Sequence, residues 1–90
     1  MGKFQFTEIA WTDYLYWQSQ DKRTLKKIND LLKDIERNGV SAGLGKPEPL
    51  KGELSGYYSR RIDEKNRIIY SEPQPGVIEI YSLKGHYREK

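Results

Sequence analysis

The sequence predicts an α+β domain in which an N-terminal strand and two helices pack on a curved antiparallel sheet. Apolar residues recur with helical periodicity in residues 8–38, and residues 57–83 are rich in β-branched and aromatic residues. A segment rich in glycine and proline, residues 39–56, separates these two parts. Because the chain has only 90 residues, we expect a single domain spanning residues 1–90.

Residues 3–6 read KFQF and alternate polar with apolar side chains, which is typical of a half-buried strand. We expect this strand at the edge of the sheet. Thr7 and Glu8 then predict the start of a helix, because a threonine hydroxyl caps the first N–H groups and an acid is favourable there. This helix should run to about Gln20, and its aromatic residues are crowded rather than arranged in one stripe.

Asp21 is the predicted cap of a second helix. Beyond it, apolar residues recur at spacings of three and four and predict a buried stripe, formed by Leu25, Ile28, Leu31, Leu32 and Ile35. Asn38 and Gly39 then predict a left-handed stop, because glycine adopts this conformation without strain.

The remaining chain predicts a loop followed by an antiparallel meander. Residues 39–56 should form the loop, with one short strand around Leu50. Three further strands are predicted, at residues 57–62, 67–71 and 77–83. Short segments rich in turn-forming residues join them, at 63–66 and 73–76.

Composition limits the classes of function. The formal net charge of +3 and the pI of about 9.1 suit an anionic partner. With no cysteine and one histidine, a metal site is not expected, and we predict no cofactor. The N-terminus does not resemble a signal peptide and no apolar run approaches the ~20 residues of a membrane helix, so a cytoplasmic protein without membrane contact is expected. The chain has two tryptophans and seven tyrosines, and we expect most of these nine rings to fill the core.

Residues 45–52, GKPEPLKG, hold one glutamate between two prolines. Pro47 and Pro49 restrict the residues before them, so Lys46 should leave the helical region and Glu48 should lie on stiff, extended backbone. Lysines on both sides favour the ionised carboxylate, which makes Glu48 a candidate proton acceptor. An exposed charge on a loop ordered by proline is the alternative, and this segment taken alone favours that alternative.

Strand alternation places Ser59 and Arg61 on one face of the predicted sheet and Arg60 on the other. We expect Arg61, Arg67, Lys84 and His86 to gather at one end of the sheet, close to the loop that carries Glu48 and Lys51. Such a group fits metal-free RNA cleavage by 2′-hydroxyl attack, in which a carboxylate removes a proton, a cation stabilises the phosphoryl oxygens and an imidazolium protonates the leaving oxygen. A solvated basic face with a surface histidine is the alternative.

Three segments carry a resemblance to a known family. Residues 11–38 (WTDYLYWQSQDKRTLKKINDLLKDIERN), residues 45–70 (GKPEPLKGELSGYYSRRIDEKNRIIY) and the terminal GHY resemble the YoeB-type toxins of the RelE superfamily in order and spacing. The resemblance implies a compact microbial-RNase-like (RelE/YoeB) α+β fold. It also implies a ribosome-dependent mRNA endonuclease that cuts the codon in the decoding site and thereby inhibits translation.

The resemblance also implies residue roles. Glu48 matches the family's general base, Arg67 the arginine of the transition state and His86 the general acid. The residues that match substrate contacts around the scissile phosphate are Lys51, Arg60, Arg61 and Tyr87. Two departures stand out: the chain continues beyond Tyr87 with residues 88–90, and Lys65, preceded by Glu64, stands where many members carry a glutamate.

Partners follow from the same resemblance. We expect mRNA on the ribosome, an antitoxin of the YefM type, and the aromatic helix of residues 8–20 as surface for that antitoxin or for a homodimer. Alternatives are a non-catalytic RNA or ribosome binder, a toxin of the same fold directed at DNA gyrase, and a purely structural partner protein.

Overall fold

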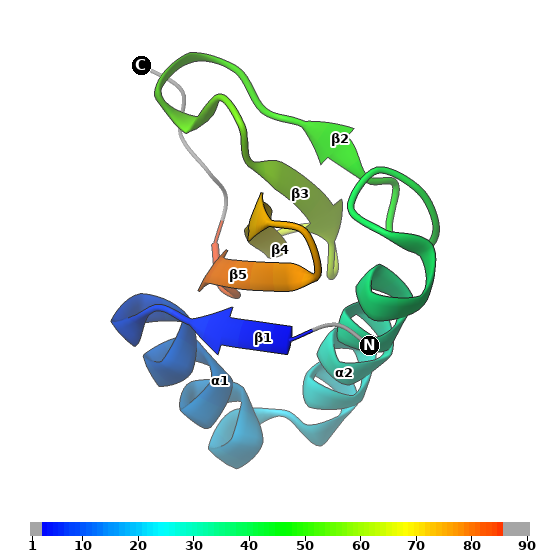
Figure 1. The fold of residues 1–90 in the computed structure, drawn as a ribbon. Coiled ribbons are helices and arrows are strands. Elements are labelled where there is room, and N and C mark those ends of the chain that lie inside the picture. Colours follow the sequence, from blue (N-terminus) through cyan, green and yellow to red (C-terminus); the bar gives the residue numbers. More distant parts are fainter. Residues whose placement is uncertain (1–2, 86–90) are drawn as a thin grey trace.

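The computed structural model describes residues 3–85, in which two helices cover one face of a five-stranded sheet (Figure 1). The elements follow in the order β1 (Lys3–Phe6), α1 (Glu8–Gln20), α2 (Lys22–Asn38), β2 (Glu48–Pro49), the 3-10 turn η1 (Gly52–Leu54), β3 (Tyr58–Arg61), β4 (Arg67–Gln74) and β5 (Val77–Ser82). This confirms the predicted α+β architecture. Neither helix of the described segment is long and apolar enough to cross a membrane.

The sheet has the order β1-β5-β4-β3-β2. Strands β3, β4 and β5 form the predicted antiparallel meander, and β1 and β2 lie at the two edges. Strand β1 runs parallel to β5, a pairing between the first and last strands that the sequence analysis did not predict. In Figure 1 the blue β1 lies beside the orange β5, so the first and last strands of the described chain are neighbours at one end of the sheet.

Both predicted helix caps are present. The Thr7 hydroxyl accepts a hydrogen bond from the Ala10 N–H, and the Asp21 carboxylate accepts from N–H groups in the first turn of α2. A hydrogen bond from the Thr24 hydroxyl, supported by backbone N–H groups, lowers the pKa of Asp21 below its ordinary value. Gly39 ends α2 at φ 87°, as the Asn-Gly pair predicted.

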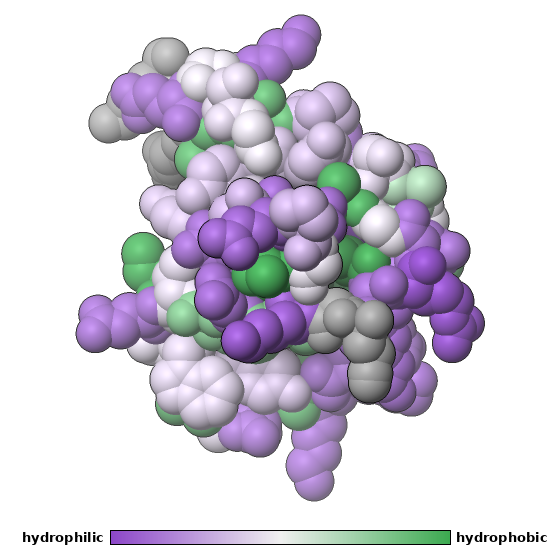
Figure 2. Space-filling model, viewed as in Figure 1, coloured by the Kyte–Doolittle hydropathy of each residue, from purple (hydrophilic) through white to green (hydrophobic). Residues whose placement is uncertain are grey.

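The core lies between the helices and the covered face of the sheet. Helix α2 buries Ile28, Leu31, Leu32 and Ile35 against Ile62, Ile68, Tyr70, Ile78 and Ile80. Trp17 of α1 joins them, but Trp11 and Tyr16 remain exposed, so fewer rings are buried than predicted. On the face drawn in Figure 2, hydrophilic side chains predominate and apolar ones form small separate patches.

Strand β4 is longer than predicted. It continues through Pro73 to Gln74, where a Pro75-Gly76 turn leads into β5. Pro73 has no N–H to donate to a regular ladder, and it is tolerated here because the pairing is irregular between Ser71 and Gln74. A second irregularity lies between Ile69 and Tyr70, and bulges of this kind bend a strand locally.

Thr7 connects the start of α1 to this bent part of the sheet. Besides capping the helix, its hydroxyl donates a hydrogen bond of 2.7 Å to the carbonyl of Tyr81 in β5. We expect Thr7→Ala to lower the free energy of unfolding by about 1–2 kcal/mol, because both hydrogen bonds are lost. Thr7→Ser keeps the hydroxyl and should retain most of the stability. Urea unfolding followed by circular dichroism measures both variants, and equal losses would contradict this role of the hydroxyl.

Candidate active site

Polar side chains gather on the face of the sheet turned away from the helices. Glu48 in β2 lies opposite Ser59 in β3, and Arg61 in β3 lies opposite Arg67 in β4. Ser59 and Arg61 are two residues apart on one strand, so their side chains share a face, while Arg60 between them points towards the core. This open face therefore combines a carboxylate and two guanidinium groups with the hydroxyl of Ser59, which is itself fully buried.

The Arg67 guanidinium contacts two of these groups. Its Nη1 lies 3.5 Å from Glu48 Oε1 and donates a hydrogen bond of 3.3 Å to Ser59 Oγ. Both contacts are longer than the roughly 2.8 Å of an optimal charged hydrogen bond. The Arg67 side chain is 17% exposed and that of Glu48 is 50% exposed, so an anchored cation stands beside an accessible carboxylate.

The strand and the loop next to this pair carry two more cations. Arg61 is exposed and lies directly across from Arg67, an arrangement in which two like charges repel each other. An anion close to both guanidinium groups would remove this repulsion. Lys51 is also exposed and follows β2 by two residues. The arrangement therefore favours an anionic ligand such as a phosphodiester.

His86 and Tyr87 lie outside the described residues. The last described residue, Gly85, accepts a hydrogen bond of 3.0 Å from the Arg67 N–H, so the described chain ends beside β4. Lys84 was expected in the same group, but its Nζ lies 3.9 Å from the centre of the Tyr16 ring on α1. Its ammonium therefore packs on the helix, and the expectation for Lys84 was wrong.

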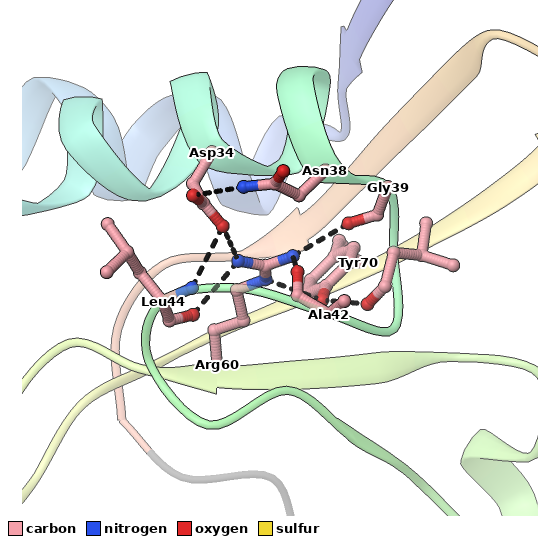
Figure 3. A network of polar contacts seen from close by, with 8 residues as sticks. Asp34, Asn38, Gly39, Ala42, Leu44, Arg60 and Tyr70 are labelled. Carbon is pink, nitrogen blue, oxygen red and sulfur yellow. Dashed lines mark hydrogen bonds and ion pairs between the residues drawn. The ribbon is translucent and has the colours of Figure 1, made fainter.

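Arg60 occupies a buried position behind the open face, and its side chain is fully inaccessible to solvent. Its guanidinium donates five hydrogen bonds (Figure 3), to the Asp34 carboxylate, the carbonyls of Gly39, Ala42 and Leu44, and the Tyr70 hydroxyl. The bond to Asp34 is 2.6 Å long and forms an ion pair between β3 and α2. Five bonds use all five N–H donors of an arginine.

These contacts correct the interpretation of Arg60 as a substrate contact. A guanidinium that is buried and fully hydrogen-bonded has no donor left for a phosphate, and exposing it would leave Asp34 unpaired. Arg60 instead holds the loop that follows α2. The residue next to it, Arg61, contributes its backbone N–H to the same loop through a 2.7 Å hydrogen bond to Gly45.

The loop packs tightly on this network. A Cβ atom at Gly43 would come within 1.9 Å of the Asp34 carboxylate, and one at Gly45 within 2.9 Å of Leu31. Lys46, predicted to leave the helical region, lies at φ 54° in the left-handed region, which is strained for a residue with a side chain. Glu48 itself is extended, as predicted. The turn at Lys46 thus directs the chain from the buried network onto the edge of the sheet.

Hydrogen bonds keep Asp34 ionised. Burial alone would raise the pKa of this carboxyl, but hydrogen bonds from Arg60, the Leu44 N–H and the Asn38 amide outweigh it and lower the pKa. Burial raises the pKa of the Tyr70 hydroxyl, although Arg60 opposes the shift. Tyr70 therefore stays protonated; it accepts from Arg60 and donates to the Val40 carbonyl.

The chemistry that this arrangement can support is acid–base and electrostatic. Glu48 can accept a proton, and Arg67 and Arg61 can stabilise negative charge. Within residues 3–85, histidine, cysteine, aspartate and glutamate form no group of three or more that could hold a metal ion.

The sequence matches a characterised family. A family profile described as "YoeB-like toxin of bacterial type II toxin-antitoxin system" covers residues 6–87. The chain belongs to this family. Toxin YoeB of Escherichia coli K12 is 48% identical over 85 residues, which span 94% of this chain and 99% of the relative. Toxin YoeB of Synechocystis is 48% identical over 86 residues, which span 96% and 98%.

Solved structures agree with the family assignment. The heterotetrameric YoeB–YefM toxin–antitoxin complex of Staphylococcus aureus contains a chain 48% identical to this YoeB-like toxin, with a TM-score of 0.88 over 97% of this chain and 99% of that one. A YoeB dimer of the same organism gives 0.88 at 49% identity, over 96% and 98%. The Escherichia coli protein YafQ shares the fold alone. One of its structures is 16% identical to this chain with a TM-score of 0.77, and another is 17% identical with a TM-score of 0.69. Both comparisons cover 96% of this chain and 94% of YafQ.

Sequence reasoning missed three polar residues that support the site of this YoeB-like toxin. Asp34 lies beside the buried Ile35 on α2. Its position at the border of the apolar stripe was the only sequence feature that indicated a partly buried carboxylate. Ser59 was assigned to the correct face, but its contact with Arg67 depends on strand pairing. Asn66 was read as a turn residue, and nothing local indicates its hydrogen bond to Gly85.

The lowered pKa of Asp34 predicts a pH-dependent stability. A carboxyl whose pKa is lower in the folded state stabilises the fold above its unfolded pKa of about 3.9, and this contribution is lost as the pH falls through the folded pKa. We expect Asp34→Asn to lower the free energy of unfolding by about 2–4 kcal/mol at pH 7. The difference from the wild type should shrink below a pH of about 4.

Asp30→Asn is the matched control for this measurement. Asp30 lies one turn earlier on α2 and forms an ion pair of 3.2 Å with Lys26, but its side chain is 45% exposed. Exposed pairs contribute about 0–1 kcal/mol, so this variant should unfold almost like the wild type. Chemical unfolding from pH 3 to pH 8 tests both variants. A loss in Asp34→Asn that did not change with pH would argue against the ion pair as its cause.

Proposed function

We propose that this YoeB-like toxin is an endoribonuclease that cuts mRNA in the decoding site of the ribosome without a metal ion, and so inhibits translation. One observation carries the proposal: the accessible Glu48 carboxylate lies 3.5 Å from the anchored guanidinium of Arg67, on the open face of the sheet. Family membership supports the class of protein as a toxin. The activity and its metal independence are the proposed part.

In the proposed reaction, Glu48 takes the proton from the 2′-hydroxyl of a nucleotide. The 2′-oxygen attacks the adjacent phosphorus while the bond from phosphorus to the 5′-oxygen breaks. Arg67 stabilises the charge that develops on the phosphoryl oxygens. His86 gives a proton to the departing 5′-oxygen. The products are a 2′,3′-cyclic phosphate and a 5′-hydroxyl, so the proton taken by the base is balanced by the proton given by the acid.

Lys51, Arg61 and Tyr87 position the substrate in this scheme. The two cations bind phosphate oxygens next to the scissile bond, which the exposed position of both and the repulsion between Arg61 and Arg67 support. Tyr87 orients the nucleotide at the cut. Arg60 has no contact with RNA and acts by holding the loop before Glu48.

Single-turnover cleavage of mRNA on programmed ribosomes tests the proposed acid and base. Acid–base groups contribute about 10²–10⁴-fold to a rate, so Glu48→Gln and His86→Gln should each cut at least 100-fold more slowly. The matched control Glu36→Gln changes an exposed glutamate on α2 and should cut at the wild-type rate. The new ends should be a cyclic phosphate and a 5′-hydroxyl.

The cleavage assay, together with a ribosome-binding assay and a DNA-supercoiling assay, separates the alternative functions. Ribosome binding without cleavage by the wild-type protein would indicate a non-catalytic binder. Intact mRNA together with altered DNA supercoiling would indicate a gyrase-directed toxin. Unchanged cleavage in both Glu48→Gln and His86→Gln would overturn the acid–base assignment.

We also propose a YefM-type antitoxin and a second copy of the chain as partners in the cytoplasm, where mRNA is translated. The Staphylococcus aureus relatives were solved as a YoeB–YefM complex and as a YoeB dimer. Helix α1 supplies exposed apolar surface for such contacts, at Ile9, Trp11, Leu15 and Tyr16, which are 53%, 51%, 44% and 40% exposed. Surface of this kind marks interaction sites.

Leu15→Glu tests the α1 surface. A buried leucine contributes about 1.5–3 kcal/mol, so the charge should raise the dissociation constant of the dimer or of the antitoxin complex at least tenfold. Gln18→Glu, an exposed position on the same helix, adds the same charge and is the control. Sedimentation of the toxin with and without antitoxin measures both equilibria. Two unchanged constants would exclude this part of α1 from either interface.

A further inference from the structure

The three residues after β5 are held by side chains from distant parts of the chain. The Leu83 N–H donates a hydrogen bond of 3.0 Å to the Asp13 carboxylate, and the Leu83 carbonyl accepts one of 2.9 Å from the Trp17 indole N–H. Asp13 and Trp17 lie one turn apart on α1. Helix α1 therefore fixes both backbone polar groups of a residue that lies beyond the last strand.

Gly85 is held by the turn between β3 and β4 and by the first residue of β4. The Gly85 N–H donates a hydrogen bond of 2.8 Å to Asn66 Oδ1, and the Gly85 carbonyl accepts one of 3.0 Å from the Arg67 N–H. Asn66 is itself held, because its amide donates to both carboxylate oxygens of Asp63 at 3.1 and 3.2 Å. Four backbone groups of residues 83–85 are thus fixed, two by α1, one by the β3–β4 turn and one by the first residue of β4.

We propose that Asn66, assisted by Asp13 and Trp17, positions the general acid His86 relative to Arg67. This inference rests on the proposed function. His86 follows Gly85 directly in the sequence. Because the Gly85 carbonyl accepts a hydrogen bond from the Arg67 N–H, the residue that precedes the acid is held at the start of β4.

The energetic reason is the cost of misplacing a catalytic group. A displacement of about 1 Å can reduce a rate about 100-fold. Residues 83–85 belong to no strand, so without these contacts their backbone groups would turn to water and their positions would vary. Asn66 is the most direct of the three positioning residues because it contacts the residue next to His86.

If Asn66 only stabilised the fold, its loss would also slow the reaction. Changing the leaving group of the substrate separates this structural role from the positioning of the acid. We would place a 5′-bridging sulfur at the cut site of a ribosome-bound mRNA. A thiol has a pKa of about 8.5, so the thiolate leaves without protonation, whereas an alkoxide needs the acid. Loss of the acid is therefore rescued by sulfur, and loss of the base or of the fold is not.

With the normal oxygen substrate, Asn66→Ala should cut about 10- to 100-fold more slowly than the full-length wild type. With the sulfur substrate it should cut within about twofold of the wild type, as His86→Gln should. Glu48→Gln should stay slow on both substrates. The matched control is Asn29→Ala, which loses a hydrogen bond from Tyr14 between the helices but does not touch residues 83–85.

Trp17→Phe provides a second variant in case Asn66→Ala does not fold. It removes the N–H that donates to Leu83 and keeps an aromatic ring in the core. It should show the same pattern, slow with oxygen and rescued by sulfur. Thermal unfolding of every variant confirms that the comparison is made between folded proteins.

The outcomes are distinguishable. Full activity of Asn66→Ala with oxygen, or an equal loss with both substrates, would overturn the positioning role. If His86→Gln cut the oxygen substrate at the wild-type rate, the acid role that the proposed function gives to His86 would fail, and the present inference with it. A slow His86→Gln rescued by sulfur, beside an unaffected Asn66→Ala, would leave the acid in place and reject only the present inference.

Discussion

The buried guanidinium of Arg60 is the interaction on which the open face depends. It joins β3 to α2 through Asp34 and collects three carbonyls from the loop between α2 and β2. A buried charge is expensive unless it is paired and hydrogen-bonded, and here every donor has an acceptor. The loop therefore cannot move without exposing unpaired polar groups. Its far end carries Glu48, whose position follows from that constraint.

Arg60 and Arg61 show how strand alternation gives one residue type two different environments. Arg60 points into the core and stabilises the loop, while Arg61 points to solvent opposite Arg67. The signal for Arg60 was present in the sequence, because its neighbours two positions away, Tyr58 and Ile62, are aromatic and aliphatic. The resemblance to a family with a basic active site favoured a substrate contact instead, and the burial of Arg60 decides against it.

Features governed by local interactions were predictable from the sequence. The caps at Thr7 and Asp21, the apolar stripe of α2 and the meander depend on neighbours a few residues apart. The parallel pairing of β1 with β5 was missed because it joins residues more than 70 positions apart and has no local signature. The left-handed turn at Lys46 was also missed, since the loop contacts with Arg60 override the local preference set by Pro47.

The membership of the candidate site was predictable only in part. Glu48 and Arg67 lie together as expected, whereas Arg60 and Lys84 point elsewhere, and the roles of His86 and Tyr87 stay predictions. The polar residues that hold those groups, Asp34 and Asn66, act on backbone atoms remote in sequence, and such contacts leave no periodic pattern.

A chain of 90 residues has a thin core, which explains why buried and bridging polar contacts carry so much of this site. Apolar packing fixes the helices against one face of the sheet, but the segments that join the elements need polar contacts as well. Arg60 holds the loop after α2, and Asp13 and Trp17 hold the segment after β5. The two supports start from different helices and meet at Arg67, which contacts Glu48 through its side chain and Gly85 through its backbone. Within residues 3–85, Arg67 therefore links the part of the site that carries Glu48 to the segment that ends at Gly85.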